Sequence, residues 1–398
     1  MRRFPYFCKP FGDEVFTSWF FRVAKGNLTN TSTFSRIILN DRTLFNTDCD
    51  LRLPDRTLRI LDEELGVDRD LLYASTISSL IGNYLTGLKD NGHDREVLNA
   101  KTRYERRNNY GQQYCPICLG KDVAYYKKIW RVTAITTCLE HRVVLSDRCP
   151  FCHATVNCHK LTWFHSGANF CYRCGKDLTK SPIQNIEAFS SIIEFQKKIE
   201  ESMVTGWVEI SPRERVRTPI FHEGLRFLMK PWIASKNCST MYEHFSKYAG
   251  VPMTAFSEIR HWPKRLNTQS SLSRFKLYAI LGWFLEDWPD RFTGFCDYKG
   301  LTPTSFFKTN AVPPFWLTDV FQTSLAKKNY WVNMEEIRSA TRYIYKNNFK
   351  ISPANVAEAV GLDRSIYLPA TRRKYIRRVV KLQSKNACSP VKIFHWKL

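Results

Sequence analysis

Apolar residues recur at helical spacing near the start of the chain. Between residues 13 and 24, Phe16, Trp19, Phe20 and Val23 stand three or four positions apart. This spacing places them on one face of a helix. Two acidic residues at positions 13 and 14 stand where negative charge favours a helix N-terminus. The pattern predicts a helix that buries its apolar face.

A second helical pattern covers residues 57–72. An amphipathic stretch ends at Gly66, and Asp68 then offers an N-cap to a following helix. This is the outline of a helix-turn-helix, but any tight helical hairpin has the same outline. We therefore expect a helical N-terminal domain with a helix-turn-helix-like hairpin over residues 1–110, and the hairpin alone does not predict DNA binding.

Helical periodicity returns from about residue 186, most clearly over 193–199 and 275–285. The longest apolar run is far shorter than the about 20 residues of a membrane span, so no membrane insertion is expected. Near the C-terminus, Ser352 and Pro353 suit a helix start, and Gly361 suits the turn before a further helix. We expect a helical domain over 181–345 and a basic region with a second helix-turn-helix over 346–398.

Eight Cys and His residues stand in four pairs between these helical regions, and two residues separate the members of each pair. This gap lets both side chains of a tight turn reach one tetrahedral Zn²⁺. Eight ligands close two sites, which leaves no open coordination position for a catalytic water. The pairs predict two structural Zn²⁺ ions in a module over 111–180, bound by Cys115, Cys118, Cys138, His141, Cys149, Cys152, Cys171 and Cys174.

The pairing of these ligands has two solutions. Taken in order, they give a Cys₃His site and a Cys₄ site, which we favour; an interleaved pairing satisfies the same spacings. Disulfides are the other alternative, but the first residues lack the apolar segment of a signal peptide, which favours a reducing cytoplasm and metal binding. His153 and His159 lie near enough to compete as ligands. The remaining cysteines are expected to be buried thiols: Cys8, Cys49, Cys158, Cys238, Cys296 and Cys388.

The chain is strongly basic. Its 398 residues include 60 Lys and Arg against 37 Asp and Glu, a formal net charge of +23. Such a charge attracts polyanions, and nucleic acid is the expected partner. Residues 371–385 carry seven basic residues and no acidic one. The predicted phosphate contacts are Arg372, Arg373, Lys374, Arg377, Arg378 and Lys381.

Several of these residues resemble the signatures of the TniQ/TnsD family of transposon target-selection proteins. The opening segment, with Asp13, Glu14, Ser18, Trp19 and Arg22, is similar to that family's opening signature. The family's central Cys-Pro-x-Cys, Trp, Cys-x-x-His, Leu, Cys-Pro-x-Cys pattern resembles Cys115, Cys118, Trp130, Cys138, His141, Leu145, Cys149 and Cys152. A Trp-Pro-x-x-Phe step is similar to residues 288–292.

This resemblance implies a non-enzymatic adaptor that marks an insertion site and recruits the AAA+ regulator TnsC. The short length is similar to that of TniQ subunits of CRISPR-associated transposons, which implies a homodimer docked on a Cascade–guide RNA complex. Two alternatives stay open: a TnsD-like selector that binds its target DNA directly, and a zinc-containing transcription regulator. No phosphate-binding loop, His-Glu-x-x-His helix or nucleophile elbow occurs, so an enzyme is not expected.

Overall fold

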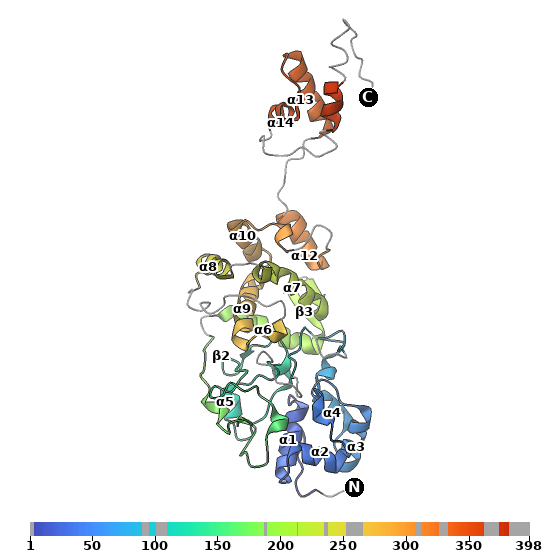
Figure 1. Ribbon diagram of the computed structural model, residues 1–398, viewed down its shortest axis with the longest axis vertical. Coiled ribbons are helices and arrows are strands. Elements are labelled where there is room, and N and C mark those ends of the chain that lie inside the picture. Colours follow the sequence, from blue (N-terminus) through green and yellow to red (C-terminus); the bar gives the residue numbers. More distant parts are fainter. Residues whose placement is uncertain are drawn as a thin grey trace. The chain divides into compact units, whose positions relative to one another are not determined.

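The computed structural model of the chain separates into two compact units, Met1–Ala326 and Lys327–Leu398. It describes residues 4–89, 95–100, 110–186, 189–212, 214–234, 238–251, 266–306, 312–325, 333–361 and 374–381. Helices dominate each unit and the strands are short (Figure 1). The prediction of a mainly helical chain is thus confirmed. The finer division at residues 110, 180 and 345 stays a prediction.

The N-terminal part of the first unit is a group of helices around an aromatic core. Phe16, Trp19 and Phe20 of α1 are fully buried, as the spacing predicts. Gly66 ends α3 with φ 65°, and the Asp68 carboxylate accepts the amide of Asp70 at the start of α4. The predicted hairpin is therefore present. The elements are α1 (Phe16–Gly26), α2 (Thr31–Leu39), η1 (Leu44–Asn46), α3 (Asp55–Leu65), α4 (Arg69–Ala74) and η2 (Ile77–Leu80).

Next in the chain lies a segment with little regular structure, which holds the eight Cys and His residues. Strands β1 and β2 pair antiparallel, with Thr137 opposite Val144 and Cys138 opposite Val143. The other elements are single turns of helix. The bounds are α5 (Pro116–Leu119), η3 (Lys128–Arg131), β1 (Thr137–Cys138), β2 (Val143–Val144), η4 (Cys158–Lys160) and η5 (Leu178–Lys180).

The rest of the first unit is helical, with one antiparallel hairpin. Helices α6 and α9 contain the two predicted helical stretches and pack closely, because Gly282 of α9 lies against the backbone of Ser191 in α6. The elements are α6 (Ser190–Thr205), β3 (Trp207–Ser211), β4 (Glu214–Arg217), α7 (Thr218–Ala234), α8 (Cys238–Ala249), η7 (Leu266–Thr268), α9 (Ser271–Glu286), α10 (Asp290–Lys299), α11 (Pro303–Phe306), α12 (Phe315–Asp319) and η8 (Val320–Ser324).

Buried polar side chains join the metal-ligand segment to these helices. The Gln196 amide of α6 accepts the Thr137 amide at 2.9 Å and donates to the Thr137 carbonyl at 2.7 Å. Arg274 of α9 is fully buried and donates to the Thr133 carbonyl at 2.6 Å. One apolar core runs through both parts. The metal-ligand segment is therefore an integral part of the first unit.

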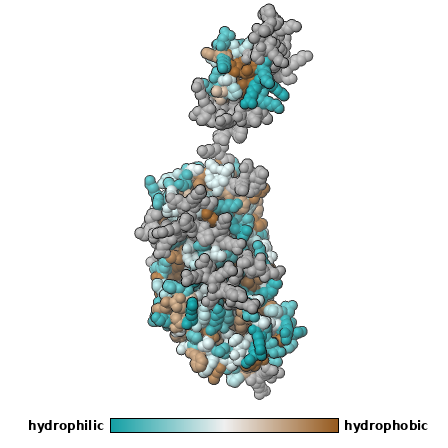
Figure 2. All heavy atoms as spheres, in the orientation of Figure 1, coloured by the Kyte–Doolittle hydropathy of each residue, from teal (hydrophilic) through white to brown (hydrophobic). Residues whose placement is uncertain are grey.

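The second unit contains α13 (Met334–Lys346), α14 (Pro353–Ala359) and a helix over residues 374–381. Asn333 and Glu336 form a capping box at the start of α13, and Ser352 caps α14 with Pro353 at its first position. Ile337, Val356 and Ile376 meet in a small core. Hydrophilic side chains cover much of the face of this unit that Figure 2 shows, around apolar ones. None of the helices in the described ranges combines the length and apolar character that a bilayer span requires.

Candidate metal centres

The first cluster consists of Cys115, Cys118, Cys138 and His141. Cys115 caps α5, where its sulfur accepts the Cys118 amide at 3.5 Å. Cys138 ends β1, and the turn between β1 and β2 brings His141 back toward it. Their ligand atoms all lie within 4.8 Å of one another. A helix N-terminus and a strand turn, two local structures, thus bring the four side chains together.

The distances within the first cluster fit a tetrahedral metal ion. The sulfurs of Cys118 and Cys138 are 3.7 Å apart. The Nδ1 atom of His141 lies 3.6, 3.2 and 3.5 Å from the sulfurs of Cys115, Cys118 and Cys138. Metal–sulfur bonds of about 2.3 Å give a tetrahedron with sulfur–sulfur edges of about 3.8 Å. The cluster therefore has the size of a Cys₃His zinc site, with Nδ1 as the nitrogen ligand.

The second cluster, Cys149, Cys152, Cys171 and Cys174, is built from two turns with the same hydrogen bonds. The Cys149 amide donates to the Ala154 carbonyl, and the Cys171 amide donates to the Lys176 carbonyl. The residue after each second cysteine adopts a left-handed conformation, with φ 56° at His153 and 67° at Gly175. His153 is thus a turn residue. His159 stacks on Phe45 with ring centres 5.2 Å apart, and neither histidine belongs to a cluster.

Distances in the second cluster also fit a metal ion. Cys149 and Cys174 have sulfurs 3.6 Å apart, as do Cys152 and Cys171. All four sulfurs lie within 4.8 Å of one another. This is the size of a Cys₄ zinc site. The structure therefore joins the ligands in sequence order, and the interleaved pairing does not occur.

Electrostatics within the clusters favour thiolate at particular positions. Hydrogen bonds from the Cys115 and Cys118 thiols lower the pKa of Cys138. Desolvation opposes ionisation of Cys174, but the Lys176 amide and the neighbouring thiols outweigh it and lower its pKa to about 7. Thiolate is the form that binds metal. Each cluster thus holds one cysteine that ionises readily.

The other cysteines of the described ranges form no disulfide and stand outside both clusters. Cys49, Cys158 and Cys296 are buried, as predicted, and Cys8 is half-buried. The side chain of Cys238 and all of Cys388 lie outside the described residues. Burial raises the pKa of the Cys49 and Cys158 thiols well above its usual range, so these side chains act as apolar residues.

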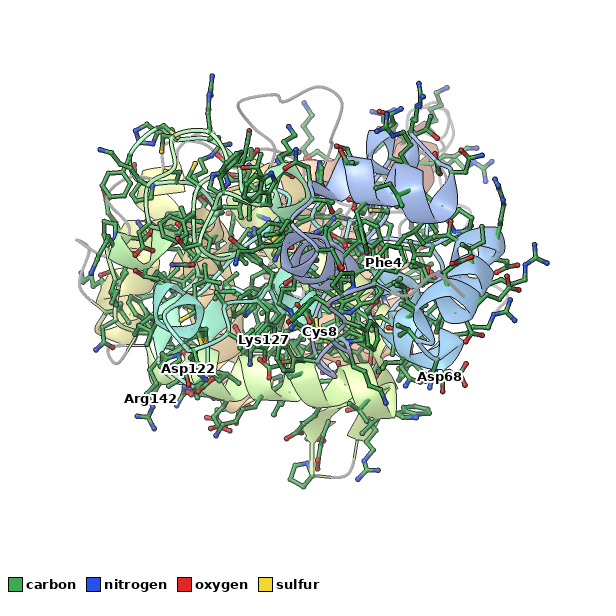
Figure 3. All side chains as sticks on the ribbon, turned by 90° about the horizontal axis from the view of Figure 1, so that it is seen from below. Phe4, Cys8, Asp68, Asp122, Lys127 and Arg142 are labelled. Atoms are coloured by element: carbon green, nitrogen blue, oxygen red, sulfur yellow. The ribbon has the colours of Figure 1, made fainter. Side chains whose placement is uncertain are left out.

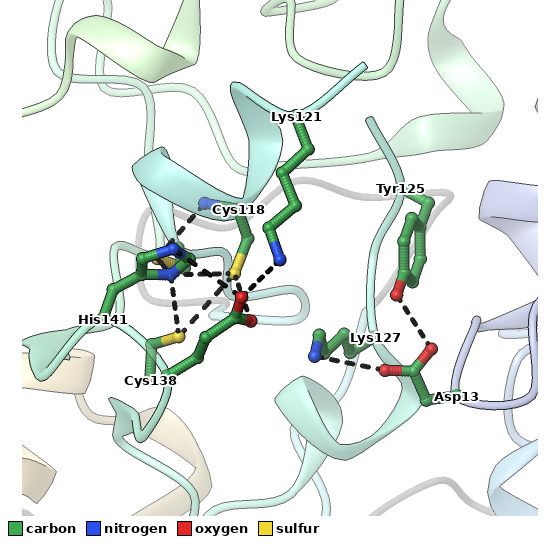
Figure 4. A network of polar contacts seen from close by, with 9 residues as sticks. Asp13, Cys118, Lys121, Tyr125, Lys127, Cys138 and His141 are labelled. Atoms are coloured by element: carbon green, nitrogen blue, oxygen red, sulfur yellow. Dashed lines mark hydrogen bonds and ion pairs between the residues drawn. The ribbon is translucent and has the colours of Figure 1, made fainter. Parts of the chain in front are cut away.

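Charged residues surround the first cluster (Figure 4). The Glu140 carboxylate lies 3.8 Å from the Cys118 sulfur and 3.9 Å from Nε2 of His141, and it pairs with Lys121 at 2.5 Å. The Lys121–Glu140 pair is about half exposed, so it adds little to stability. Nearby, Asp13 pairs with Lys127 at 3.2 Å and accepts the Tyr125 hydroxyl at 3.0 Å.

The contacts of Asp13 with Lys127 and Tyr125 tie the N-terminal segment to the ligand-bearing segment. Phe4 packs edge to face on Phe34 of α2, and the Cys8 carbonyl accepts the indole N–H of Trp19 in α1 at 2.8 Å; Figure 3 labels Phe4 and Cys8. Glu14 is fully buried and pairs with Arg22 at 2.5 Å, and the Ser18 hydroxyl donates to Glu14 and accepts the Tyr126 amide. Residues of the opening signature thus make structural contacts, and Ser18 joins α1 to Tyr126 of the ligand-bearing segment.

This arrangement coincides with a family match. Residues 5–145 match the family model for TniQ. These residues are similar to a TniQ domain. The match covers the opening signature and the whole first cluster, and the family is associated with target selection in transposition. A comparison with curated proteins gave no match.

Outside the match to TniQ, four of the six predicted phosphate contacts lie on the last described helix, over residues 374–381. Lys374, Arg377, Arg378 and Lys381 are exposed on it, whereas Ile376 is fully buried in the core of the second unit. Arg372 and Arg373 lie outside the described residues, as does the start of the second helix of the predicted helix-turn-helix. Phosphate contact by these residues stays a prediction.

Sequence reasoning assigned no structural role to Arg131. Its guanidinium is fully buried and pairs with Asp48 and Asp50. Lys128 is also engaged, since its ammonium donates to the Ala74 carbonyl and the Ser79 hydroxyl. Local sequence carries no signal for these contacts, because each joins segments about 50 or more positions apart.

Proposed function

We propose that both clusters bind Zn²⁺ and that each ion has a structural role. Four protein ligands close each site, so no position is open for a substrate or an activated water. Bound zinc would hold together the ligand-bearing turns of a segment that contains little regular structure. The metal centres would then stabilise the surfaces around them.

We further propose that the chain is an adaptor in transposition target selection, which connects a target complex to the AAA+ regulator TnsC. The observation that carries this proposal is the TniQ match over residues 5–145. TniQ proteins are non-catalytic adaptors, and closed metal clusters suit a chain that presents surfaces. One surface would engage the target, another would nucleate TnsC, and two copies would form a homodimer.

The target complex is proposed to be a Cascade–guide RNA assembly, by resemblance to short TniQ proteins. A specific observation favours a second candidate, a TnsD-like protein that binds target DNA directly. The helix over residues 374–381 exposes four cations from one short segment and has no acidic residue. A row of cations of this kind binds phosphates without reading bases, so it would serve either function.

A charge-reversal experiment distinguishes the two candidates. Arg377→Glu/Arg378→Glu alters the C-terminal helix, and Arg56→Glu/Arg59→Glu is a matched variant on the exposed side of α3. Binding of the full chain to Cascade–guide RNA and to duplex target DNA is measured over a range of salt concentrations. Each lost phosphate contact lowers the salt slope by about 1.

The adaptor proposal expects tight binding to Cascade and weak, salt-sensitive DNA binding that falls in the C-terminal variant alone. Tight binding to one duplex without Cascade, lost in the same variant, would establish the TnsD-like candidate instead. If neither Cascade nor duplex binds, and TnsC is not recruited, both candidates are wrong.

A further inference from the structure

Two neighbouring aromatic residues beside the second cluster lie stacked on the surface. The rings of Trp163 and Phe164 have centres 3.9 Å apart and planes 27° apart. Phe164 is 76% exposed, although a large apolar side chain is normally covered. Trp163 lies against one face of the Phe164 ring, which leaves the other face to solvent. The pair thus contributes little to the core and presents a flat aromatic surface.

The turn that carries this pair is held firmly. The His165 amide donates to the Thr162 carbonyl at 3.1 Å, and the Thr162 amide donates to Nδ1 of His165 at 3.1 Å. The Trp163 amide donates to the Asn30 side chain at 3.3 Å, and the Thr31 hydroxyl donates to the His159 carbonyl. Both anchors belong to the start of α2, so the exposed rings project from a turn that is fixed to the segment that matches TniQ.

Cations flank aromatic rings along the same segment. The Lys176 ammonium lies 4.6 Å from the centre of the Phe151 ring, which is 45% exposed. The Lys160 ammonium lies 5.1 Å from the centre of the Tyr172 ring, and Arg173 is exposed beside it. Tyr172 stands between two ligands, and Lys160 stands three residues before Trp163. The Lys160–Tyr172 contact therefore connects the second cluster to the segment that carries the stacked pair.

The charge of the segment is one-sided. From residue 148 to 176 the chain contains four Lys and Arg residues and no Asp or Glu. Three of the four cations lie over aromatic rings: Arg148 over Tyr110, Lys160 over Tyr172 and Lys176 over Phe151. A protein partner would need an acidic and apolar surface to match this one. Single-stranded nucleic acid offers both required features on every nucleotide: an aromatic face and a phosphate.

We propose that this stacking surface binds single-stranded nucleic acid; its residues are Phe151, Lys160, Trp163, Phe164, Arg173 and Lys176. A base would stack on the open face of Phe164 and extend the aromatic pair, while Lys160, Arg173 and Lys176 would contact phosphates. Duplex nucleic acid fits less well, because its bases already stack on one another. The site lies outside the match to TniQ and on a different unit from the basic C-terminal helix, so it is independent of the proposed adaptor role.

The test uses the full chain, zinc-loaded, at one fixed salt concentration. Fluorescence anisotropy measures binding of labelled oligo-dT, oligo-rU and a duplex of equal length to the wild type and to Phe164→Ala. Loss of one stacked base is expected to weaken single-strand binding about five-fold or more and duplex binding much less. Phe315→Ala is the matched control, since Phe315 is an aromatic residue, 59% exposed, on α12. The dT and rU arms show whether DNA or RNA binds better.

A second variant, Arg173→Gln/Lys176→Gln, should reduce the salt dependence of single-strand binding while the zinc content stays at the wild-type level. Unchanged oligonucleotide affinity in Phe164→Ala overturns the proposal. So does an equal loss for single strand and duplex. If Phe164→Ala instead loses a protein partner of the transposition complex and keeps oligonucleotide affinity, the surface is a protein-docking site and the proposal is wrong.

Discussion

Arg131 and Asp48, 83 positions apart in the chain, form an ion pair of 2.5 Å in which the guanidinium is fully buried. The same guanidinium lies 3.0 Å from Asp50 and donates to the Leu98 carbonyl. Desolvation raises the pKa of Asp50 to about 6 even though Arg131 opposes this shift. This network joins the N-terminal helices to the ligand-bearing segment and makes the fold depend on one cation.

Replacing Arg131 by Met should therefore destabilise the first unit strongly. The change leaves the buried Asp50 carboxylate and the largely covered Asp48 carboxylate without their cation, which costs about 3–5 kcal/mol in the free energy of unfolding. Urea denaturation followed by circular dichroism measures the effect, which should be larger at pH 8 than at pH 5 because protonation relieves the carboxylates. Lys121→Met removes a half-exposed pair and serves as control, with an expected loss below about 1 kcal/mol. Equal losses in the two variants would contradict this account.

Gly282 should tolerate no larger side chain. A Cβ atom at this position would lie 2.8 Å from the Ser191 carbonyl oxygen and 3.0 Å from Cβ of Phe195. Gly282→Ala should therefore separate α6 from α9 and cost about 1–3 kcal/mol. Gly12→Ala is the control, since no atom lies within 4 Å of its added Cβ. Thermal unfolding of both variants checks the prediction, and a Gly282→Ala protein as stable as the wild type would refute close packing here.

Loss of one zinc ligand should remove one ion and disrupt its module. Cys149→Ser is expected to lower the zinc content from about two ions per chain to about one and to broaden the thermal transition. Cys8→Ser, outside both clusters, should keep the full metal content. Zinc is measured by colorimetric titration after denaturation. A cooperatively folded Cys149→Ser protein with unchanged metal content would show that the second cluster does not bind zinc.

Stability should fall as pH falls, in part through His222. Its ring is buried against Tyr84, its Nε2 has no hydrogen-bond partner among the described residues, and desolvation lowers its pKa to about 3. Between the unfolded pKa of about 6.5 and this value, only the unfolded state binds the proton, so protonation favours unfolding. The effect is absent well above pH 6.5 and grows as pH falls toward 3.

His222→Gln removes this titration. The loss of unfolding free energy between pH 7 and pH 5 should be smaller in the variant by about 2 kcal/mol, since one pKa unit corresponds to about 1.4 kcal/mol. Denaturation at the two pH values with excess zinc measures the difference. The same pH dependence in variant and wild type would mean that His222 is not neutral and buried in the folded chain.

Local patterns in the sequence predicted much of this structure. Helices α1, α3 and α14 carry their own periodicity or caps, and the two-residue spacing of the ligand pairs fixes each turn. The choice between sequential and interleaved pairing was not predictable from the spacing, because Cys138 and His141 stay together in both. Only the tertiary structure shows that this pair lies beside Cys115 and Cys118.

What the sequence could not predict rests on contacts between distant segments. In the sequence, Arg131 looks like any exposed cation of a basic protein. Only the structure shows that it is buried and paired with Asp48 and Asp50. The reverse holds for Phe164, which looks like a core residue in sequence and is 76% exposed. In each case the tertiary environment reverses the usual expectation for the residue type.

The adaptor role is tested most directly by measuring whether this chain causes TnsC to be retained on Cascade-bound target DNA. Cascade–guide RNA bound to immobilised target DNA is incubated with TnsC and ATP, with and without this chain, and retained TnsC is quantified. The account predicts that TnsC is retained only when the chain is present and that the chain is retained with Cascade. Retention of TnsC without the chain, or no retention in its presence, would contradict the adaptor role.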